Sequence, residues 1–175
     1  KEEKQWLDAH ENTIRVGYLK DNLPFCGEEN GELTGILGTV LDTVQEKYKI
    51  TIKAVPCSTG VEMNEALQSG KIDIAGPIIQ DLYTQEQFQV VLTDEIFDIT
   101  PVVIYKGNEY SSSLSTIAAT DTSLYSELMV SFLFPDAEIK QYDTQEECLE
   151  AVANGKAGAT VIPSSKINLL NESPL

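Results

Sequence analysis

Small polar and turn-forming residues directly follow three segments that are rich in β-branched and aromatic residues. Such segments predict β-strands, and loops after strands often carry the groups that meet a ligand. The carboxylate, amide, hydroxyl and backbone groups in these loops could bind a polar ligand by hydrogen bonds. The residues concerned are Asp21, Asn22, Gly76, Pro77, Gln80, Thr122 and Ser123.

Two of these pairs have a structural explanation as well as a functional one. Asp21 and Asn22 suit hydrogen bonding to a polar ligand, and they suit a solvated turn equally well. Gly76 and Pro77 would either let the backbone approach a ligand closely or form a plain turn after a strand. The sequence leaves both alternatives open.

The third pair stands at the predicted start of a helix. Backbone N–H groups at a helix start favour an anionic or polar ligand group near Thr122 and Ser123. Helix capping alone would explain the same two residues. Gln80 adds an amide that would serve either a ligand or an ordinary loop.

The residue patterns of common enzyme classes do not occur in the sequence. It contains no Gly-x-Ser-x-Gly elbow, no His-Glu-x-x-His and no phosphate-binding loop. The spaced glycines Gly31, Gly35 and Gly38 lack the Lys-Ser/Thr of such a loop, and the segment 28–32 lacks calcium-loop spacing. We therefore expect a binding module and no enzyme, with no cofactor and no metal ion.

Three cysteines, Cys26, Cys57 and Cys148, form no Cys-x-x-Cys pair and no metal-ligand spacing. Buried free thiols are the simplest interpretation, because unpaired cysteine behaves as a small apolar residue. A Cys26–Cys57 disulfide remains an alternative, so the cysteines do not indicate a redox compartment.

The charge balance excludes two classes of partner. The 175 residues include 12 Lys and Arg against 28 Asp and Glu, a formal net charge of −16, and Arg15 is the only arginine. Nucleic acids and anionic membrane surfaces are bound by clustered basic residues. No apolar run is long enough to span a bilayer and no leader is recognisable, so we expect membrane attachment only through segments outside this chain.

Strands and helices alternate in two runs along the chain. Such alternation predicts parallel strand pairing with right-handed crossovers, and hence an α/β fold with parallel-dominated mixed sheets. The first run has strands 14–19, 50–55 and 72–75 with helices 36–44 and 59–70. The second has strands 116–119, 137–142 and 157–162 with helices 122–132, 144–153 and 164–170.

The two runs repeat at an offset of 85 residues. The capping box Thr59-x-x-Glu62 aligns with Thr144-x-x-Glu147, and the helix-ending Gly70 aligns with Gly155. Two similar α/β lobes would explain this, although helix caps also recur by physics alone. Because ligands bind at the carboxyl ends of strands in open α/β sheets, the polar loops would then line a cleft.

Several segments together resemble the family 3 extracellular solute-binding proteins, which are type 2 periplasmic binding proteins with a Venus-flytrap fold. The resemblance covers most of residues 12–165 and lies in the order and spacing of its segments. These segments are IRVGY at 14–18, LPF at 23–25, GELTG at 31–35, LQSGKID at 67–73, TDEIF at 93–97, YDT at 142–144 and EAVANGK at 150–156.

The resemblance implies a two-lobed molecule that closes on a solute by hinge motion. It implies a first lobe over 12–97, a crossover strand over 98–105 and a second lobe over 106–175, which ends before the family's return to the first lobe. An edge left open in this way would pair with another chain, so a homodimer remains an alternative.

The resemblance also implies a ligand class. An aromatic at the place of Phe25 stacks on the ligand, although packing would explain it as well. The family's amino-acid binders carry an Arg where this chain has Gln87, and an Asp where it has Gly158. A zwitterion needs a fixed charge for each of its own charges, so we expect a small polar solute other than a standard free amino acid.

The segment EKQWL at 3–7 with His10 is similar to modules that serve as input domains of membrane histidine kinases or GGDEF-type proteins. We therefore expect an extracellular, cell-surface bacterial module that senses a solute. The alternatives are the receptor of an ABC importer, and a degenerate flytrap that mediates dimerisation or protein contact without a ligand.

Overall fold

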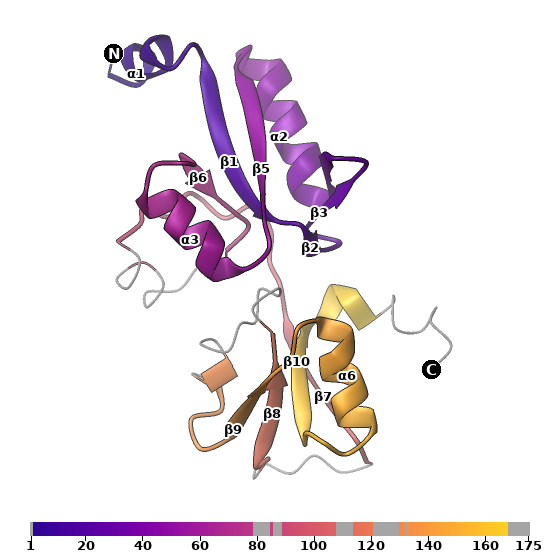
Figure 1. The fold of residues 1–175 in the computed structure, drawn as a ribbon. Coiled ribbons are helices and arrows are strands. Elements are labelled where there is room, and N and C mark those ends of the chain that lie inside the picture. Colours follow the sequence, from indigo (N-terminus) through magenta and orange to yellow (C-terminus); the bar gives the residue numbers. More distant parts are fainter. Residues whose placement is uncertain are drawn as a thin grey trace. The chain divides into compact units, whose positions relative to one another are not determined.

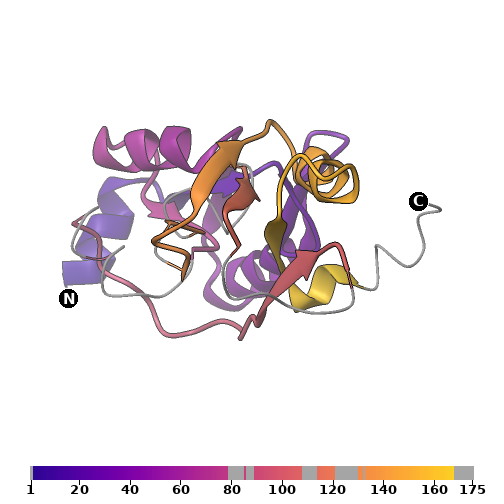
Figure 2. The same ribbon diagram turned by 90° about the horizontal axis from the view of Figure 1, so that it is seen from below.

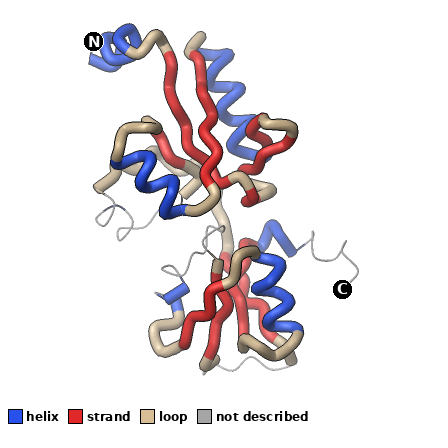
Figure 3. Tube along the Cα trace, viewed as in Figure 1, coloured by secondary structure: helices blue, strands red, loops and turns tan. Residues whose placement is uncertain are grey.

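The computed structural model describes residues 2–78, 85, 89–107, 114–120, 130–131 and 133–167. The chain divides into two compact units, residues 1–90 and 91–175 (Figures 1 and 3). This division lies earlier in the chain than the lobe boundary expected at residue 97. No helix within the described ranges is long and apolar enough to cross a membrane.

The core of the first unit is a parallel sheet covered by two helices. The strands are β1 (Thr13–Leu19), β5 (Thr51–Cys57) and β6 (Ile74–Ala75), in the order β5-β1-β6. Because the chain steps from β1 to β5 and then back past β1 to β6, right-handed crossovers place the connecting helices on opposite faces. These helices are α2 (Gly35–Tyr48) and α3 (Gly60–Gln68) (Figures 1 and 2).

A small antiparallel sheet follows β1, where the sequence predicted only a loop and a turn. It comprises β2 (Asp21–Asn22), β3 (Cys26–Glu29) and β4 (Glu32–Thr34). Asn30 and Gly31 join β3 to β4 with φ values of 54° and 82°, as a two-residue hairpin turn requires. The strands were missed because they are short and carry little apolar alternation.

The sheet of the second unit is mixed. Its strands are β7 (Pro101–Tyr105), β8 (Thr116–Ala119), β9 (Glu138–Gln141) and β10 (Ala159–Pro163), in the order β7-β10-β8-β9. The inner strand β8 is parallel to both β9 and β10, whereas β7 is antiparallel to β10. The segment expected to cross between lobes thus supplies, in β7, an edge strand of the second unit.

Other predicted elements differ in part. The final helix predicted over 164–170 begins as a 3₁₀ turn, η1 (Ser164–Lys166). The helix predicted over 122–132 falls almost entirely outside the described residues. An N-terminal helix that was not predicted, α1 (Glu2–Ala9), has no buried residue.

Capping confirms the predicted repeat at the start of its helices. The Thr59 hydroxyl accepts the N–H of Glu62 at 3.1 Å, and the Thr144 hydroxyl accepts the N–H of Glu147 at 3.2 Å. In both units the glutamate carboxylate accepts in return the N–H of the residue before the cap, at 2.7 and 3.0 Å. The two N-termini are therefore held by the same pair of bonds.

The helix ends repeat as closely. The Ala66 carbonyl accepts N–H groups from Lys71 at 2.8 Å and Ile72 at 3.2 Å. In α6 (Gln145–Ala153) the Ala151 carbonyl accepts the N–H groups of the residues 85 positions after these two, at the same 2.8 and 3.2 Å. Helix, turn and following strand thus form one motif that occurs twice.

We predict that Thr59→Ala and Thr144→Ala each lower the free energy of unfolding by about 1 kcal/mol, because each removes a side-chain helix cap. Urea unfolding followed by circular dichroism measures the loss. The control is Thr43→Ala, within exposed turns of α2, where alanine has the higher helix propensity. A comparable loss in that variant would show that capping is not the cause.

Candidate functional site

The predicted polar loops of the first unit lie together at the carboxyl end of its sheet. Lys20 follows β1, and its N–H donates to the Cys57 carbonyl at the end of β5 at 3.1 Å. Gly76 follows β6, and its N–H donates to the Gly17 carbonyl of β1 at 3.0 Å. The loop that holds Asp21 and the turn that begins at Gly76 therefore follow neighbouring strands and lie at the same, carboxyl end of the sheet.

The start of α2 fixes the loop after β1. The N–H groups of Ile36 and Leu37 donate to the carbonyls of Pro24 at 3.0 Å and Phe25 at 2.9 Å. These N–H groups lie in the first turn of the helix, where no earlier helical carbonyl is available. Gly35 has φ of 85°, and a Cβ placed on it would lie 2.7 Å from the Pro24 oxygen, so a glycine is required at this contact.

The loop side chains differ in exposure. Asp21 is exposed, whereas Asn22 is 0% and Phe25 1% exposed. The N–H of Phe25 donates to the Asn22 carbonyl at 3.0 Å, which closes a tight turn. Of the two explanations for Phe25, its burial favours packing, whereas the Asp21 side chain is open to solvent.

Tyr18 lies beside this loop at 1% exposure. Its hydroxyl donates to the Glu28 carboxylate at 3.5 Å. Burial, and then the negative charge of Glu28, raise the pKa of Tyr18 above its usual value. The phenol therefore stays protonated at neutral pH and acts there as a hydrogen-bond donor.

The three cysteines are free and buried, as predicted. The Cys26 thiol donates to the Leu19 carbonyl at 3.2 Å. Burial raises the pKa of Cys57, and it raises the pKa of Cys148 to about 11. Because the thiolate is the reactive form, Cys148 is poorly suited to nucleophilic chemistry.

In the second unit, Thr120 is the described polar residue that follows β8. It is 1% exposed, and its hydroxyl donates to the carbonyl of Asp143, just after β9, at 3.2 Å. This contact joins two strand ends of the sheet. Thr120 belongs to the loop predicted to follow this strand, although it was not among the candidate binding residues.

Gly158 lies at the other end of the second sheet, contrary to the expected place near a ligand. Its N–H donates to the carbonyl and hydroxyl oxygens of Thr116 at 2.9 and 3.0 Å, before β10 begins. Pro163 ends that strand at its carboxyl end. Four further predicted site residues lie outside the described residues: Gln80, Gln87, Thr122 and Ser123.

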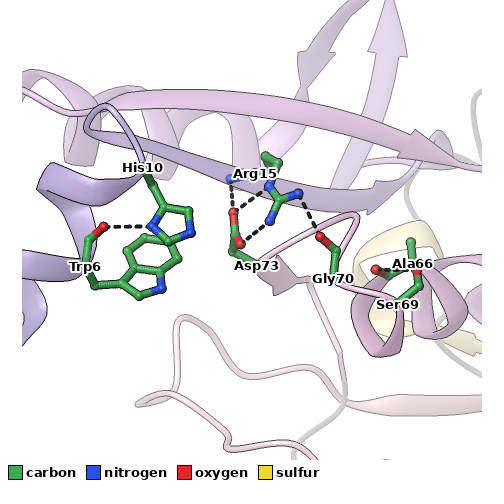
Figure 4. A network of polar contacts seen from close by, with 7 residues as sticks. All are labelled: Trp6, His10, Arg15, Ala66, Ser69, Gly70 and Asp73. Carbon is green, nitrogen blue, oxygen red and sulfur yellow. Dashed lines mark hydrogen bonds and ion pairs between the residues drawn. The ribbon is translucent and has the colours of Figure 1, made fainter.

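The only arginine of the chain is held near the amino end of the first sheet (Figure 4). Arg15 donates from Nε and Nη2 to the two carboxylate oxygens of Asp73, at 2.9 and 2.6 Å, and from Nη1 to the Gly70 carbonyl at 2.7 Å. Its backbone N–H adds a bond of 2.8 Å to Asp73. The guanidinium therefore braces the turn after α3.

The N-terminal helix ends close to this ion pair (Figure 4). The rings of Trp6 and His10 stack with centroids 3.9 Å apart, and Nδ1–H of His10 donates to the Trp6 carbonyl at 2.7 Å. His10 is exposed. This arrangement terminates α1 and orients the chain toward β1.

The Arg15 guanidinium lowers the pKa of Asp73 below its ordinary value. A depressed pKa means that the pair stabilises the fold fully above pH about 4 and loses this effect as the pH falls through the lowered pKa. We predict that Asp73→Asn is destabilising at neutral pH and that the difference from the unmodified chain shrinks below pH 4.

Urea unfolding at pH 7 and pH 3 measures this difference. Asp42→Asn on the exposed face of α2 is the matched control and should show a small effect at both values. An Asp73→Asn deficit that persists undiminished at pH 3 would contradict a charge-based role.

Within the described ranges, no group of three or more His, Cys, Asp or Glu could hold a metal ion.

No protein-family model matches the chain. The chain is 28% identical over 158 residues to a probable amino-acid-binding protein of Bacillus subtilis, YxeM, covering 86% of this chain and 59% of that protein. The chain thus spans less than two thirds of this curated relative.

A second curated relative is the membrane-bound lytic murein transglycosylase F of Shewanella sediminis. It is 26% identical over 167 residues, which cover 90% of this chain and 34% of the transglycosylase.

Solved structures share the fold. The periplasmic VFT2 domain of Bordetella pertussis BvgS superposes with a TM-score of 0.75 at 22% identity, over 98% of this chain and 74% of that one. An ancestral amino-acid-binding protein, a precursor of cyclohexadienyl dehydratase, gives 0.74 at 22% identity, over 97% and 80%. The chain therefore has the two-lobed α/β Venus-flytrap fold of the type 2 periplasmic binding proteins, and the predicted resemblance to extracellular solute-binding proteins is confirmed.

Proposed function

We propose that this chain is an extracytoplasmic module that binds a small polar solute without catalysis. The observation that carries the proposal is the similarity to an amino-acid-binding protein across 86% of the chain, joined to a binding-protein fold. The described loops at the carboxyl strand ends of the first unit fit this role, because Asp21 is exposed there on a loop that α2 holds in place.

The ligand we propose is a neutral or cationic solute, or a peptide, and no standard free amino acid. Arg15 is the only arginine, and it is already bound to Asp73 and Gly70 near the amino end of the sheet. A bidentate clamp for a ligand carboxylate therefore has no guanidinium available. Gly158 lies just before β10, at the amino end of that strand, so its lack of a carboxylate does not bear on the ligand class.

A thermal-shift screen tests both statements. The panel contains the twenty L-amino acids, dipeptides and polyamines, each at millimolar concentration. A ligand at about 100 times its Kd stabilises the folded state by roughly 2.7 kcal/mol. Strong stabilisation by an ordinary L-amino acid would overturn the ligand class, and no response to any class would overturn solute binding.

The role we propose for the module is sensory input to a membrane signalling protein. It is supported by the likeness to a BvgS periplasmic domain, of which this chain covers only 32%, so the fold occurs there within a longer periplasmic region. A gene that encodes a free lipoprotein beside a permease would contradict this role and favour an importer.

A further inference from the structure

Asparagine followed by glycine occurs at two places in the chain, Asn30-Gly31 and Asn154-Gly155. Asn30 and Gly31 form the turn between β3 and β4, whereas Asn154 and Gly155 directly follow α6. All four residues are exposed. The two pairs therefore have the same local sequence and similar access to water, and they differ in how their backbone is held.

An asparagine that precedes a glycine is open to attack by its own backbone. The nitrogen of the following residue attacks the side-chain Cγ and closes a five-membered succinimide, while the side-chain nitrogen leaves as ammonia with the proton that the backbone nitrogen gives up. Water then opens the ring at either carbonyl, which leaves aspartate or isoaspartate. Each event thus consumes one water molecule and releases one ammonia. Glycine favours the reaction because it has no side chain to hinder the approach of its nitrogen.

The two glycine nitrogens differ in hydrogen bonding. The Gly155 N–H donates to the Val152 carbonyl at 3.1 Å, and the Asn154 N–H donates to the Glu150 carbonyl at 2.9 Å. In contrast, none of the described groups accepts the Gly31 N–H. A nitrogen whose proton is held in a hydrogen bond must give up that bond before it attacks, so only the nitrogen of Gly31 is ready to react in the folded chain.

We propose that Asn30 is a site of spontaneous deamidation in the folded protein, with water as the only co-reactant, and that Asn154 is protected by the end of α6. The hydrogen bond of Gly155 slows the reaction there by up to about tenfold relative to Asn30. The proposal does not depend on the solute or on the sensory role.

The products change the hairpin that carries Asn30. Either product places a further carboxylate beside Glu28, Glu29 and Glu32, where like charges repel. Isoaspartate also adds a methylene to the main chain, so the two-residue turn no longer fits the register of Glu29 opposite Glu32. Because β3 also pairs with the loop that holds Asp21, the modification alters a neighbour of the candidate binding loop.

Incubation of the folded chain in neutral buffer, followed over time by peptide mapping with mass spectrometry, tests the proposal. We expect the peptide that contains Asn30 to deamidate several-fold faster, up to about tenfold, than the peptide that contains Asn154, and to yield isoaspartate as well as aspartate. Equal rates, a faster reaction at Asn154, or an Asn30 that stays intact would each overturn the proposal.

The same incubation in urea separates hydrogen bonding from sequence context. Unfolding breaks the bond of Gly155, so both peptides should then deamidate at similar rates. A preference for Asn30 that persists undiminished in urea would contradict the proposal, because neighbouring side chains would then be its cause.

Two matched substitutions identify the site in the folded chain. Glutamine has one more methylene and does not close a five-membered ring with the next nitrogen. We expect Asn30→Gln to remove most of the acidic form that accumulates on ion exchange, and Asn154→Gln to leave its accumulation unchanged. Accumulation at the original rate in Asn30→Gln, or its loss in Asn154→Gln, would refute the assignment.

Discussion

Phe25→Ala lowers the free energy of unfolding by about 3–5 kcal/mol, the largest effect that we expect from a single substitution in the first unit. The ring is 1% exposed, and the backbone on both sides of it is hydrogen-bonded, to Asn22 and to Leu37 of α2. Truncation leaves a cavity that this bonded backbone cannot close easily. Urea unfolding followed by circular dichroism measures the loss.

Phe25→Leu is the matched control, because it keeps most of the apolar volume. We expect it to cost less than about 1.5 kcal/mol. If Phe25 stacked on a ligand instead, both variants would unfold like the unmodified chain and fail only in solute binding. A stable Phe25→Ala variant would therefore restore the ligand-stacking interpretation.

Gly35→Ala is the second substitution with a large expected effect. We expect it to lower the free energy of unfolding by about 2–4 kcal/mol. Part of it is the positive φ of 85°, which costs an L-residue about 1–2 kcal/mol. The rest is steric, since the added Cβ would lie 2.7 Å from the Pro24 oxygen and 3.0 Å from the Phe25 oxygen. Relief of that clash requires the loop after β1 to move away from α2.

Gly31→Ala separates the two causes. Gly31 has a similar φ of 82°, but its added Cβ would meet nothing within 4 Å. We expect this variant to lose only the conformational part, about 1–2 kcal/mol. Equal losses at both positions would mean that backbone strain alone explains Gly35 and that the α2 contact is unimportant.

The main elements could be predicted because they carry strong local signals. Local patterns predict single elements: the alternation from Ile14 to Leu19 predicts a strand, the apolar face of 36–44 predicts a helix, and each capping box predicts the start of a helix. The repeat at 85 residues then indicates two similar units. The β2–β4 sheet could not be predicted, because its strands are two to four residues long. What stabilises them is the contact with α2, which only the tertiary structure shows.

The candidate site was predicted in part. The predicted strands 14–19 and 72–75 end where the structure has the loop at Asp21 and the turn at Gly76. Gly158 was misplaced because aligning it to a motif ignored that β10 begins one residue later. Arg15 binds Asp73, which lies 58 positions later in the sequence. Phe25 is buried where α2 contacts its loop. No local sequence pattern indicates contacts of either kind.

The duplicated helix–turn–strand motif has a consequence for how the chain folds. Its contacts join residues close in sequence, from Thr59 to Ile72 and from Thr144 to Ala157. Contacts of this kind form with little loss of chain entropy, whereas the pairing of β1 with β6 joins residues 58 positions apart, such as Val16 and Ile74. We therefore expect each unit to have its own early folding nucleus, and the long-range strand pairing that completes each sheet to form later.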